Sequence, residues 1–318
     1  MPQGENMTDI QYDILTGIFN NVYDVCSELN NRFSRRLLTK GNNIRVRNIL
    51  IHPSEIITIC VFFPYSGFKT FKQYYESSVL CVLHKEFKNL PCYSYFLQLR
   101  EKVLNIFVML LCKNMRNKCT GISYIDSFCI KVCHNKRIYN HKVFKGLAGR
   151  SKTSMDWFYG FKLHLLVNTN GEVVNFCFTA GNIPDNDESV LNSLLNEKVY
   201  GSVYGDKGYL INKNKKKKLK EKNIRLITRK RKNMKNKANS SLLDGLFLNK
   251  RNIIESIGNI LKNVFELEHT RHRSSTGLIS HIFSTMIAYI FKKRKPSTFL
   301  QINAKFHSDE NTLNLKPA

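Results

Sequence analysis

Three acidic residues of this chain have the types and the surroundings that a two-metal site needs: Asp126, Asp206 and Glu255. Asp126 lies within one apolar run and Asp206 directly after another, as residues near strand ends do. Glu255 lies on the polar side of a predicted amphipathic helix. Carboxylate oxygens suit hard cations such as Mg²⁺, and a pair of divalent cations can drive in-line attack on a phosphodiester bond. The three residues therefore predict metal-dependent chemistry on a polyphosphate substrate.

The helix predicted over Asn249–Phe265 places Glu255 opposite an apolar stripe. The residues of the stripe recur at helical spacing: Ile253, Ile257, Ile260, Leu261 and Val264. At about 100° per residue, Arg251, Glu255 and Lys262 fall within roughly 40° of one another on the other side. A solvated face with an i,i+4 ion pair has the same pattern, and helix geometry alone favours that simpler interpretation.

The charge of the chain indicates a polyanionic partner. Its 318 residues contain 50 Lys and Arg against 24 Asp and Glu, a formal net charge of +26. Such a field favours nucleic acid or an anionic membrane surface. Half of this excess lies in Lys213–Lys237, where fourteen basic residues accompany a single acid. The lysines of its first half fit a solvated helix equally well, whereas Arg229, Lys230 and Arg231 follow a predicted strand and are expected to contact phosphates.

Other features argue against a membrane or secreted protein. The longest uninterrupted apolar stretch, Ile106–Cys112, is far shorter than the roughly 18 residues of a membrane span. The N-terminus resembles no secretory signal, so we expect a cytoplasmic protein. An odd number of cysteines, nine, favours reduced thiols. Cys129, Cys133 and His134 are close in sequence but lack a second ligand pair at the spacing of a zinc finger.

The pattern of apolar residues divides the chain into a helical and a mixed part. Residues 1–118 are predicted to form a small helical domain, with helices over Ile10–Asn30, Ser54–Phe63, residues 68–87 and residues 93–115. Residues 119–295 are predicted to form an α/β domain, and residues 296–318 a flexible tail.

The α/β part shows a distinctive order of elements. Strands are predicted at Ile122–Val132, at two runs within 157–181 joined by a turn at Asn168–Gly171, at Gly201–Tyr209 and at Ile224–Thr228. Helices are predicted at Asp185–Asn196, Lys213–Asn223, Asn249–Phe265 and Ser274–Phe291. Three antiparallel strands followed by parallel strands with helices between them is the order of a ribonuclease-H-like fold, with a mixed sheet and flanking helices.

Several motifs occur together in the order found in one known family. They read CHNKRIYNHKVFKGLAGRSKTSMDWFYGFKLHL, GDKGYL, LITRKRKNMKN and RNIIESIGNILKN followed by EHTRHRS. With SEIITICVFFPYSGFKTFKQYY and LPCYSYFLQL nearer the N-terminus, the chain resembles bacterial insertion-sequence transposases of the DDE type over residues 10 to 295. The group that it resembles most is the one numbered nine-eight-two.

This resemblance implies a site and an activity. The triad is Asp126, Asp206 and Glu255, holding two Mg²⁺ ions for which Mn²⁺ can substitute. The activity is cleavage of DNA at the ends of an insertion sequence and transfer of the 3′-OH to target DNA. The expected partners are double-stranded DNA and further copies of the chain, as a dimer or larger synaptic complex near the nucleoid. The N-terminal domain is expected to bind DNA ends, and the expected DNA contacts are Arg137, Lys162, Lys207, Arg229, Lys230, Arg231, Arg251, Lys262, Arg271 and Arg273.

The chain departs from the family pattern at three positions. Leu248 stands where a tyrosine is common, and Ser151 and Asp156 stand where glycines are expected. These departures bear on activity and leave two alternatives open. One is a decayed copy that only binds DNA, and the other is a nuclease that cuts without joining. His164 either faces the site or belongs to the core.

Overall fold

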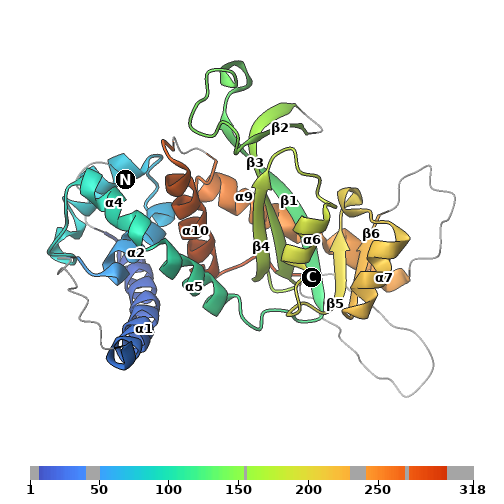
Figure 1. Cartoon of the computed structure of the whole chain (residues 1–318), viewed down its shortest axis with the longest axis horizontal. Helices are drawn as coiled ribbons and strands as arrows, with labels where there is room; N and C mark the ends of the chain where they lie inside the picture. Colours follow the sequence, from blue (N-terminus) through green and yellow to red (C-terminus); the bar gives the residue numbers. More distant parts are fainter. Residues whose placement is uncertain (1–6, 41–50, 154–155, 230–240, 269–271, 299–318) are drawn as a thin grey trace.

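The computed structural model describes residues 7–40, 51–153, 156–229, 241–268 and 272–298. It shows a helical part beside a mixed sheet, with one C-terminal helix, α10 (Ser275–Phe291), lying between the two (Figure 1). Within the described ranges, no helix combines the length and the apolar character that a membrane span requires.

The sheet has antiparallel strands at one side and parallel strands at the other. Its strands are β1 (Ile122–Cys133), β2 (Gly149–Lys152), β3 (Trp157–Asn168), β4 (Val173–Ala180), β5 (Gly201–Gly205) and β6 (Ile224–Thr228). β3 pairs antiparallel with β1 on one edge and with β2 and β4 on the other, while β1, β5 and β6 run parallel. The predicted α/β fold with a ribonuclease-H-like core is confirmed.

Helices cover both faces of the sheet, and alternate residues of each strand enter two different cores. Ile125 and Leu166 pack with α6 (Glu188–Leu194) and α7 (Lys213–Glu221) on one face. Tyr124 and Leu165 pack on the other face with the apolar residues of α8 (Leu242–Lys250), α9 (Asn252–Asn259) and α10. Neighbouring residues of β1 therefore belong to different chemical environments.

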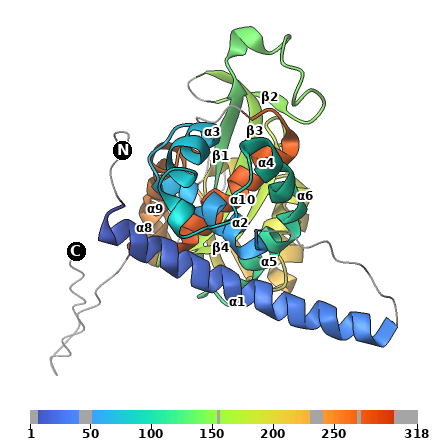
Figure 2. The same ribbon diagram turned by 90° about the vertical axis from the view of Figure 1, so that its left-hand side faces the viewer.

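The N-terminal part consists of α1 (Asp9–Lys40), α2 (Pro53–Phe62), α3 (Phe71–Tyr74), α4 (Tyr93–Lys102) and α5 (Leu104–Asn114). Figure 2 shows α1 along the outside of this group. α2 begins with a capping box, in which His52 and Glu55 satisfy the first backbone N–H groups, and most of its residues are buried. One continuous core joins these helices to α9, α10 and the sheet, so the predicted domain boundary at residue 118 remains a prediction.

Two predicted helices are interrupted in the structure. The helix expected over residues 93–115 ends at Lys102 and restarts at Leu104, because Val103 (φ −100°, ψ 10°) leaves the helical conformation. The helix expected over Asn249–Phe265 is divided at Arg251 and ends in a π-helical turn, Ile260–Val264. The wider π turn shifts the helical period. Val264, expected in the buried stripe, is consequently 57% exposed, and that expectation was wrong.

Shorter differences concern the remaining elements. Residues 68–87 form α3, a π turn and a 3₁₀ turn in place of one helix. The strand predicted within Gly201–Tyr209, with its end near Asp206, ends at Gly205, and a 3₁₀ turn begins after Asp206. β2 was not predicted, because its four residues lie within a basic loop and become a strand only through pairing with β3.

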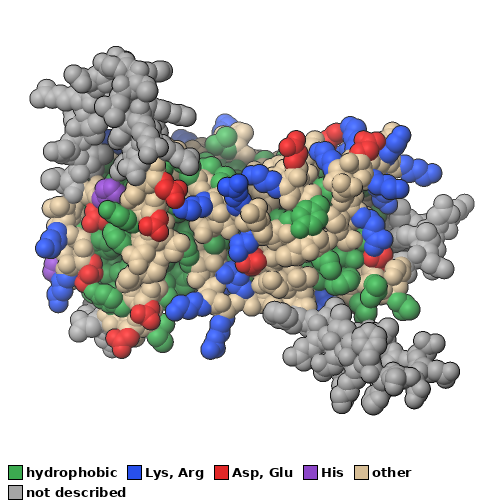
Figure 3. Space-filling model, turned by 90° about the horizontal axis from the view of Figure 1, so that it is seen from below, with side chains coloured by type: hydrophobic (Ala, Val, Ile, Leu, Met, Phe, Trp, Pro, Cys, Tyr) green, Lys and Arg blue, Asp and Glu red, His purple; other side chains and the backbone are tan. Residues whose placement is uncertain are grey.

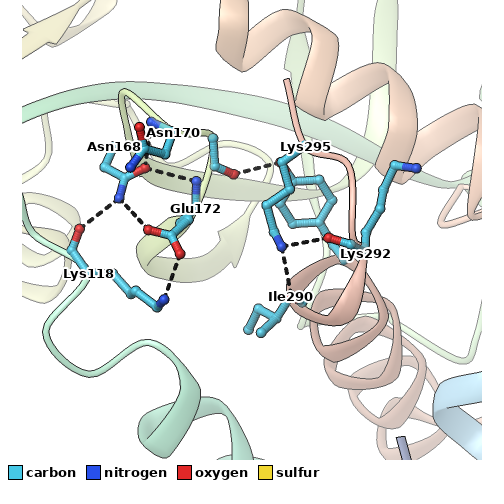
Figure 4. A network of polar contacts seen from close by, with 9 residues as sticks. Lys118, Asn168, Asn170, Glu172, Ile290, Lys292 and Lys295 are labelled. Atoms are coloured by element: carbon cyan, nitrogen blue, oxygen red, sulfur yellow. Dashed lines mark hydrogen bonds and ion pairs between the residues drawn. The ribbon is translucent and has the colours of Figure 1, made fainter. Parts of the chain in front are cut away.

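A polar network attaches α10 and the α5–β1 connection to the sheet (Figure 4). In the β3–β4 turn, the Glu172 carboxylate accepts hydrogen bonds from Lys118 Nζ at 2.6 Å and from Asn168 Nδ2 at 2.9 Å. Burial favours a higher pKa for Glu172, but these hydrogen bonds outweigh it and lower the pKa. Tyr289 of α10 donates to the Gly171 carbonyl of the same turn at 2.7 Å. Three distant segments thus meet at one turn.

Buried histidines predict that the fold loses stability in mild acid. His281 of α10 is 5% exposed, and burial lowers its pKa to about 4. In the unfolded chain the histidine has a pKa near 6.5, so it binds a proton below that pH. In the folded chain it stays neutral until the pH is much lower. The free energy of unfolding should therefore fall between pH 7.5 and 5.5, by roughly 1 kcal/mol for each such histidine. Urea unfolding should show a smaller fall in the free energy of unfolding for His281→Gln than for the parent. The exposed control His84→Gln should show the same fall as the parent. An identical fall in His281→Gln would contradict this prediction.

Candidate active site

Strand pairing brings the first two acidic residues together. β1 and β5 are parallel neighbours in which Ile125 pairs with Gly205, so the residues that follow, Asp126 and Asp206, lie next to one another. β5 ends there, and the Asp206 carbonyl accepts a hydrogen bond from Tyr209 N at 3.0 Å that begins the 3₁₀ turn. β1 continues for seven further residues. The two carboxylates therefore lie at the carboxyl end of β5 and in the middle of β1.

Arg251 connects the third acidic residue to the first. Its Nη1 donates to Asp126 Oδ2 at 2.5 Å and its Nη2 donates to Glu255 Oε1 at 3.3 Å. The side chains of Arg251 and Asp126 are 16% and 20% exposed, whereas that of Glu255 is 59% exposed. Helix α9 lies close to β1, because a Cβ at Gly258 would lie 2.2 Å from Phe128 Cε1. The sequence alone favoured a solvated i,i+4 ion pair between Arg251 and Glu255. In the structure Arg251 also bonds Asp126 of β1.

Burial shifts the protonation of Asp126. It raises the pKa of this carboxyl to about 6, and the nearby Asp206 charge adds to the increase. The Arg251 guanidinium and the Ser127 N–H act in the opposite direction. A desolvated carboxylate beside a second one is common where proteins bind cations or carry out catalysis.

The donor set fits a hard divalent cation, since all three predicted ligands are carboxylates and a guanidinium already bridges two of them. Within the described ranges, no three His, Cys, Asp or Glu side chains are grouped closely enough to hold a metal ion together. Glu255 instead reaches Asp126 through Arg251. The metal assignment therefore stays a prediction.

A second polar cluster lies on the opposite face of β1, beneath α6. Asp185 Oδ1 accepts hydrogen bonds from Ser127 Oγ and from Lys162 Nζ, both at 3.0 Å. His164 pairs with Ser127 across the strands, is fully buried, and bonds Thr179 Oγ1 through Nε2 at 2.9 Å. Burial lowers the pKa of His164 to about 4, so its ring is neutral at pH 7. Of the two interpretations left open, the core histidine is the one that the structure supports.

Asp185 is the residue that sequence reasoning missed. In GNIPDNDES it differs little from Asp187, which is simply the N-cap of α6. Only the fold shows that Asp185 lies beneath β1 while Asp187 faces solvent. Through Ser127 it contacts the residue next to Asp126, so it can fix the backbone that positions that carboxylate.

The predicted DNA contacts lie in several different environments. Lys207 is exposed directly after Asp206, and Arg229 is exposed and bonds Asn249 Oδ1 at 2.6 Å. Arg273 precedes α10 and is exposed. Lys230, Arg231 and Arg271 lie outside the described residues. On the face seen in Figure 3, basic side chains occur along the whole length of the molecule, as an extended polyanion would require.

Lys162 and Lys262, like Arg251, already pair with acidic side chains within the protein. Lys162 is 14% exposed and bonds Asp185 and the Ile183 carbonyl. Lys262 lies in the π turn Ile260–Val264 and forms an ion pair with Glu268 at 3.3 Å. The expectation that it shares one face with Arg251 and Glu255 stays a prediction.

The three departures from the family pattern have local explanations. Leu248 is 8% exposed and belongs to the core. Ser151 pairs with Phe158 within β2. The Asp156 carboxylate accepts hydrogen bonds from Asn135 Nδ2 at 3.2 Å and from Trp157 N at 2.6 Å, so its charge is partly satisfied before any DNA arrives.

The structure predicts that Asp126 lowers stability in the absence of metal. Its folded-state pKa lies about two units above the ordinary value, which corresponds to at most roughly 3 kcal/mol. Because the folded state binds the extra proton, stability falls as pH rises from about 4 to 6. Asp126→Asn should therefore be more stable than the parent by about 1 kcal/mol at pH 7.5 in EDTA, and the gain should vanish near pH 4. Urea unfolding measures both, with exposed Asp13→Asn as the control. A loss at pH 7.5 would mean that the ion pair with Arg251 outweighs burial.

Comparison with known proteins identifies the class. Residues 116–275 match the family described as Transposase DDE domain, which is half of the chain and includes every strand of the sheet, together with Asp126, Asp206 and Glu255. The chain belongs to this family, and it is a transposase of the DDE type whose substrate is DNA. No curated protein and no solved structure is matched by the chain.

Proposed function

We propose that this transposase cuts DNA at the ends of an insertion sequence and joins the freed 3′-OH to target DNA. The observation that carries the proposal is the placement of the first two acids side by side, with the third linked to one of them. Asp126 and Asp206 are neighbours on β1 and β5, and Arg251 bonds both Asp126 and Glu255. The ordered motifs of the chain support its assignment to the group numbered nine-eight-two.

Asp126, Asp206 and Glu255 would hold two Mg²⁺ ions, or Mn²⁺ in their place. Such a pair activates the attacking hydroxyl and stabilises the leaving oxygen in an in-line displacement. Burial raises the pKa of Asp126, and the Arg251 guanidinium opposes that increase before any cation arrives. Arg251 is also close enough to the carboxylates to contact a substrate phosphate.

Neighbouring cations are placed to hold the DNA backbone. Lys207 follows Asp206 directly and is exposed. Arg229 lies at the end of β6, next to β5 in the sheet. Charge-assisted contacts of this kind fix the register of a duplex without reading its sequence. The substrate that fits is double-stranded DNA, with a dimer or larger assembly bridging two ends.

Two alternatives remain within the family. A decayed copy would bind DNA without cutting it, but all three acids are present and Asp126 and Asp206 are adjacent. A nuclease with the same core would cut without joining. An active transposase joins a pre-cut 3′ end to target DNA, whereas neither the decayed copy nor the nuclease would do so.

We expect Asp126→Asn, Asp206→Asn and Glu255→Gln each to reduce Mg²⁺-dependent cleavage of labelled end DNA at least a hundredfold, since each removes a ligand charge. Binding of the same DNA in a mobility-shift assay should change little. Exposed Asp13→Asn and Glu197→Gln are matched controls and should cut normally. Cleavage at the parent rate by any of the three variants would remove that residue from the site.

Cation binding should also be visible without DNA. A ligand that binds only the folded state at about ten times its dissociation constant adds roughly 1.4 kcal/mol, which raises Tm by about 2 °C for a chain of this size. Mg²⁺ or Mn²⁺ should produce this rise in the parent and in Glu197→Gln, but not in Asp126→Asn. An equal rise in Asp126→Asn would place the cation elsewhere.

A further inference from the structure

The segment that connects β1 to β3 projects beyond the sheet, and we name its described residues, 134–153 with 156 and 157, the arm. It is the green loop with β2 that rises above the rest of the molecule in Figures 1 and 2. It contains six Lys or Arg residues and one acid, Asp156. All six cations are exposed, and within the described ranges none of them forms an ion pair with an acid: Lys136, Arg137, Lys142, Lys145, Arg150 and Lys152.

The arm also exposes apolar and aromatic side chains among these cations. Tyr139 is 91% exposed, whereas Tyr200, the next most exposed aromatic side chain among the described residues, is 53% exposed. Leu147 is 53% exposed, and Trp157 is 44% exposed with the Arg150 guanidinium 4.8 Å from its ring centre. A group of apolar side chains exposed to water is unfavourable and marks a binding surface. Nucleic acid suits this one, because its bases offer faces for aromatic rings and its phosphates offer partners for the cations.

The arm is held in shape by a buried anchor. Phe144 is 2% exposed and packs edge-on against Phe161 of β3, with ring centres 5.6 Å apart. Tyr159 of β3 donates to the Phe144 carbonyl at 3.1 Å. The turn that leads to Tyr139 is closed by a hydrogen bond from Arg137 N to the His134 carbonyl at 2.8 Å. Tyr139 is therefore displayed on a fixed support, which reduces the entropy lost on binding.

The position of the arm relative to Asp126 sets where it can meet DNA. β1 extends seven residues from Asp126 to Cys133, about 23 Å at 3.3 Å per residue. Nucleotides of one strand of a duplex are spaced by about 3.4 Å along its axis. DNA that follows β1 from Asp126 therefore reaches the base of the arm after about seven base pairs.

We propose that the arm binds double-stranded DNA about seven or more base pairs from the scissile phosphate, with its cations on the backbone and the ring of Tyr139 inserted at a base step. This inference rests on the proposed function, because Asp126 marks the scissile phosphate. A single inserted side chain unstacks one step and lets the DNA contact more protein surface. The excess charge of the arm favours a polyanion over a second copy of this basic chain.

The experiment uses end DNA with 2-aminopurine placed singly at positions 2 to 12 from the cut. Binding is measured with the Glu255→Gln protein in EDTA, so that loss of catalysis has no influence. Fluorescence should rise at one position at or beyond about seven, and adding Tyr139→Ala should abolish the rise and weaken binding about tenfold. Tyr139→Phe should keep both. Tyr200→Ala removes an exposed tyrosine at the end of β1 opposite the arm and serves as the matched control.

The charge component is tested separately. Neutralising Lys142 and Lys145 to Gln should reduce the slope of log K against log salt by about 1.8. The proposal is overturned if Tyr139→Ala binds and fluoresces like its parent, or if the rise occurs only with single-stranded DNA. It is also overturned if Tyr139→Ala changes the oligomeric state in sedimentation and leaves DNA binding intact. A Tyr139-dependent rise together with active Asp126→Asn protein would instead retain the arm and reject the proposed active site.

Discussion

The structure around the site depends on one unfavourable arrangement, a desolvated carboxylate beside a second one. Asp126 lies in the middle of β1, where burial and the neighbouring Asp206 both oppose its ionisation. Arg251 offsets this cost by bonding Asp126 and Glu255 together, and it can do so only because Gly258 lets α9 lie against Phe128. The helix, the two parallel strands and the charge of the site are therefore parts of one electrostatic arrangement. A divalent cation would relieve the same repulsion, which is why an arrangement that lowers stability is useful for catalysis.

Strand alternation then separates two kinds of polar residue that are adjacent in sequence. Asp126 faces α9 and the larger core, whereas Ser127 faces α6 and bonds Asp185. The cluster of Asp185, Lys162 and His164 is internally satisfied and has little charge to offer a ligand. The first face supplies the carboxylate of Asp126, and the second supplies a rigid support behind it. The polar turn at Glu172 extends that support to α10 and to the N-terminal helices.

Periodicity predicted long elements well and their interruptions poorly. β1, β3, β4 and β6 were predicted almost to the residue, because strands with two buried faces or a strong turn between them have clear patterns. The break at Val103 and the π turn at Ile260 were not predicted, since the apolar pattern continues through both. The π turn matters most, because it contains Val264, which is exposed, and Lys262, which pairs with Glu268. A helical wheel drawn at about 100° per residue does not include the change of period that a π turn introduces.

The sequence by itself determined the class of fold, the three acidic residues and the basic character of the molecule, because hydrophobic spacing and residue type are local properties. Family motifs added an order that only one kind of protein shares. Tertiary structure alone decided which groups meet. It placed Asp126 beside Asp206 through the register of two parallel strands, made Arg251 a bridge, and enclosed Lys162 and His164 with Asp185. It also raised Tyr139 on an anchored arm. Such contacts join residues that are far apart in the chain, and pairing register and burial, which no local pattern contains, decide between them.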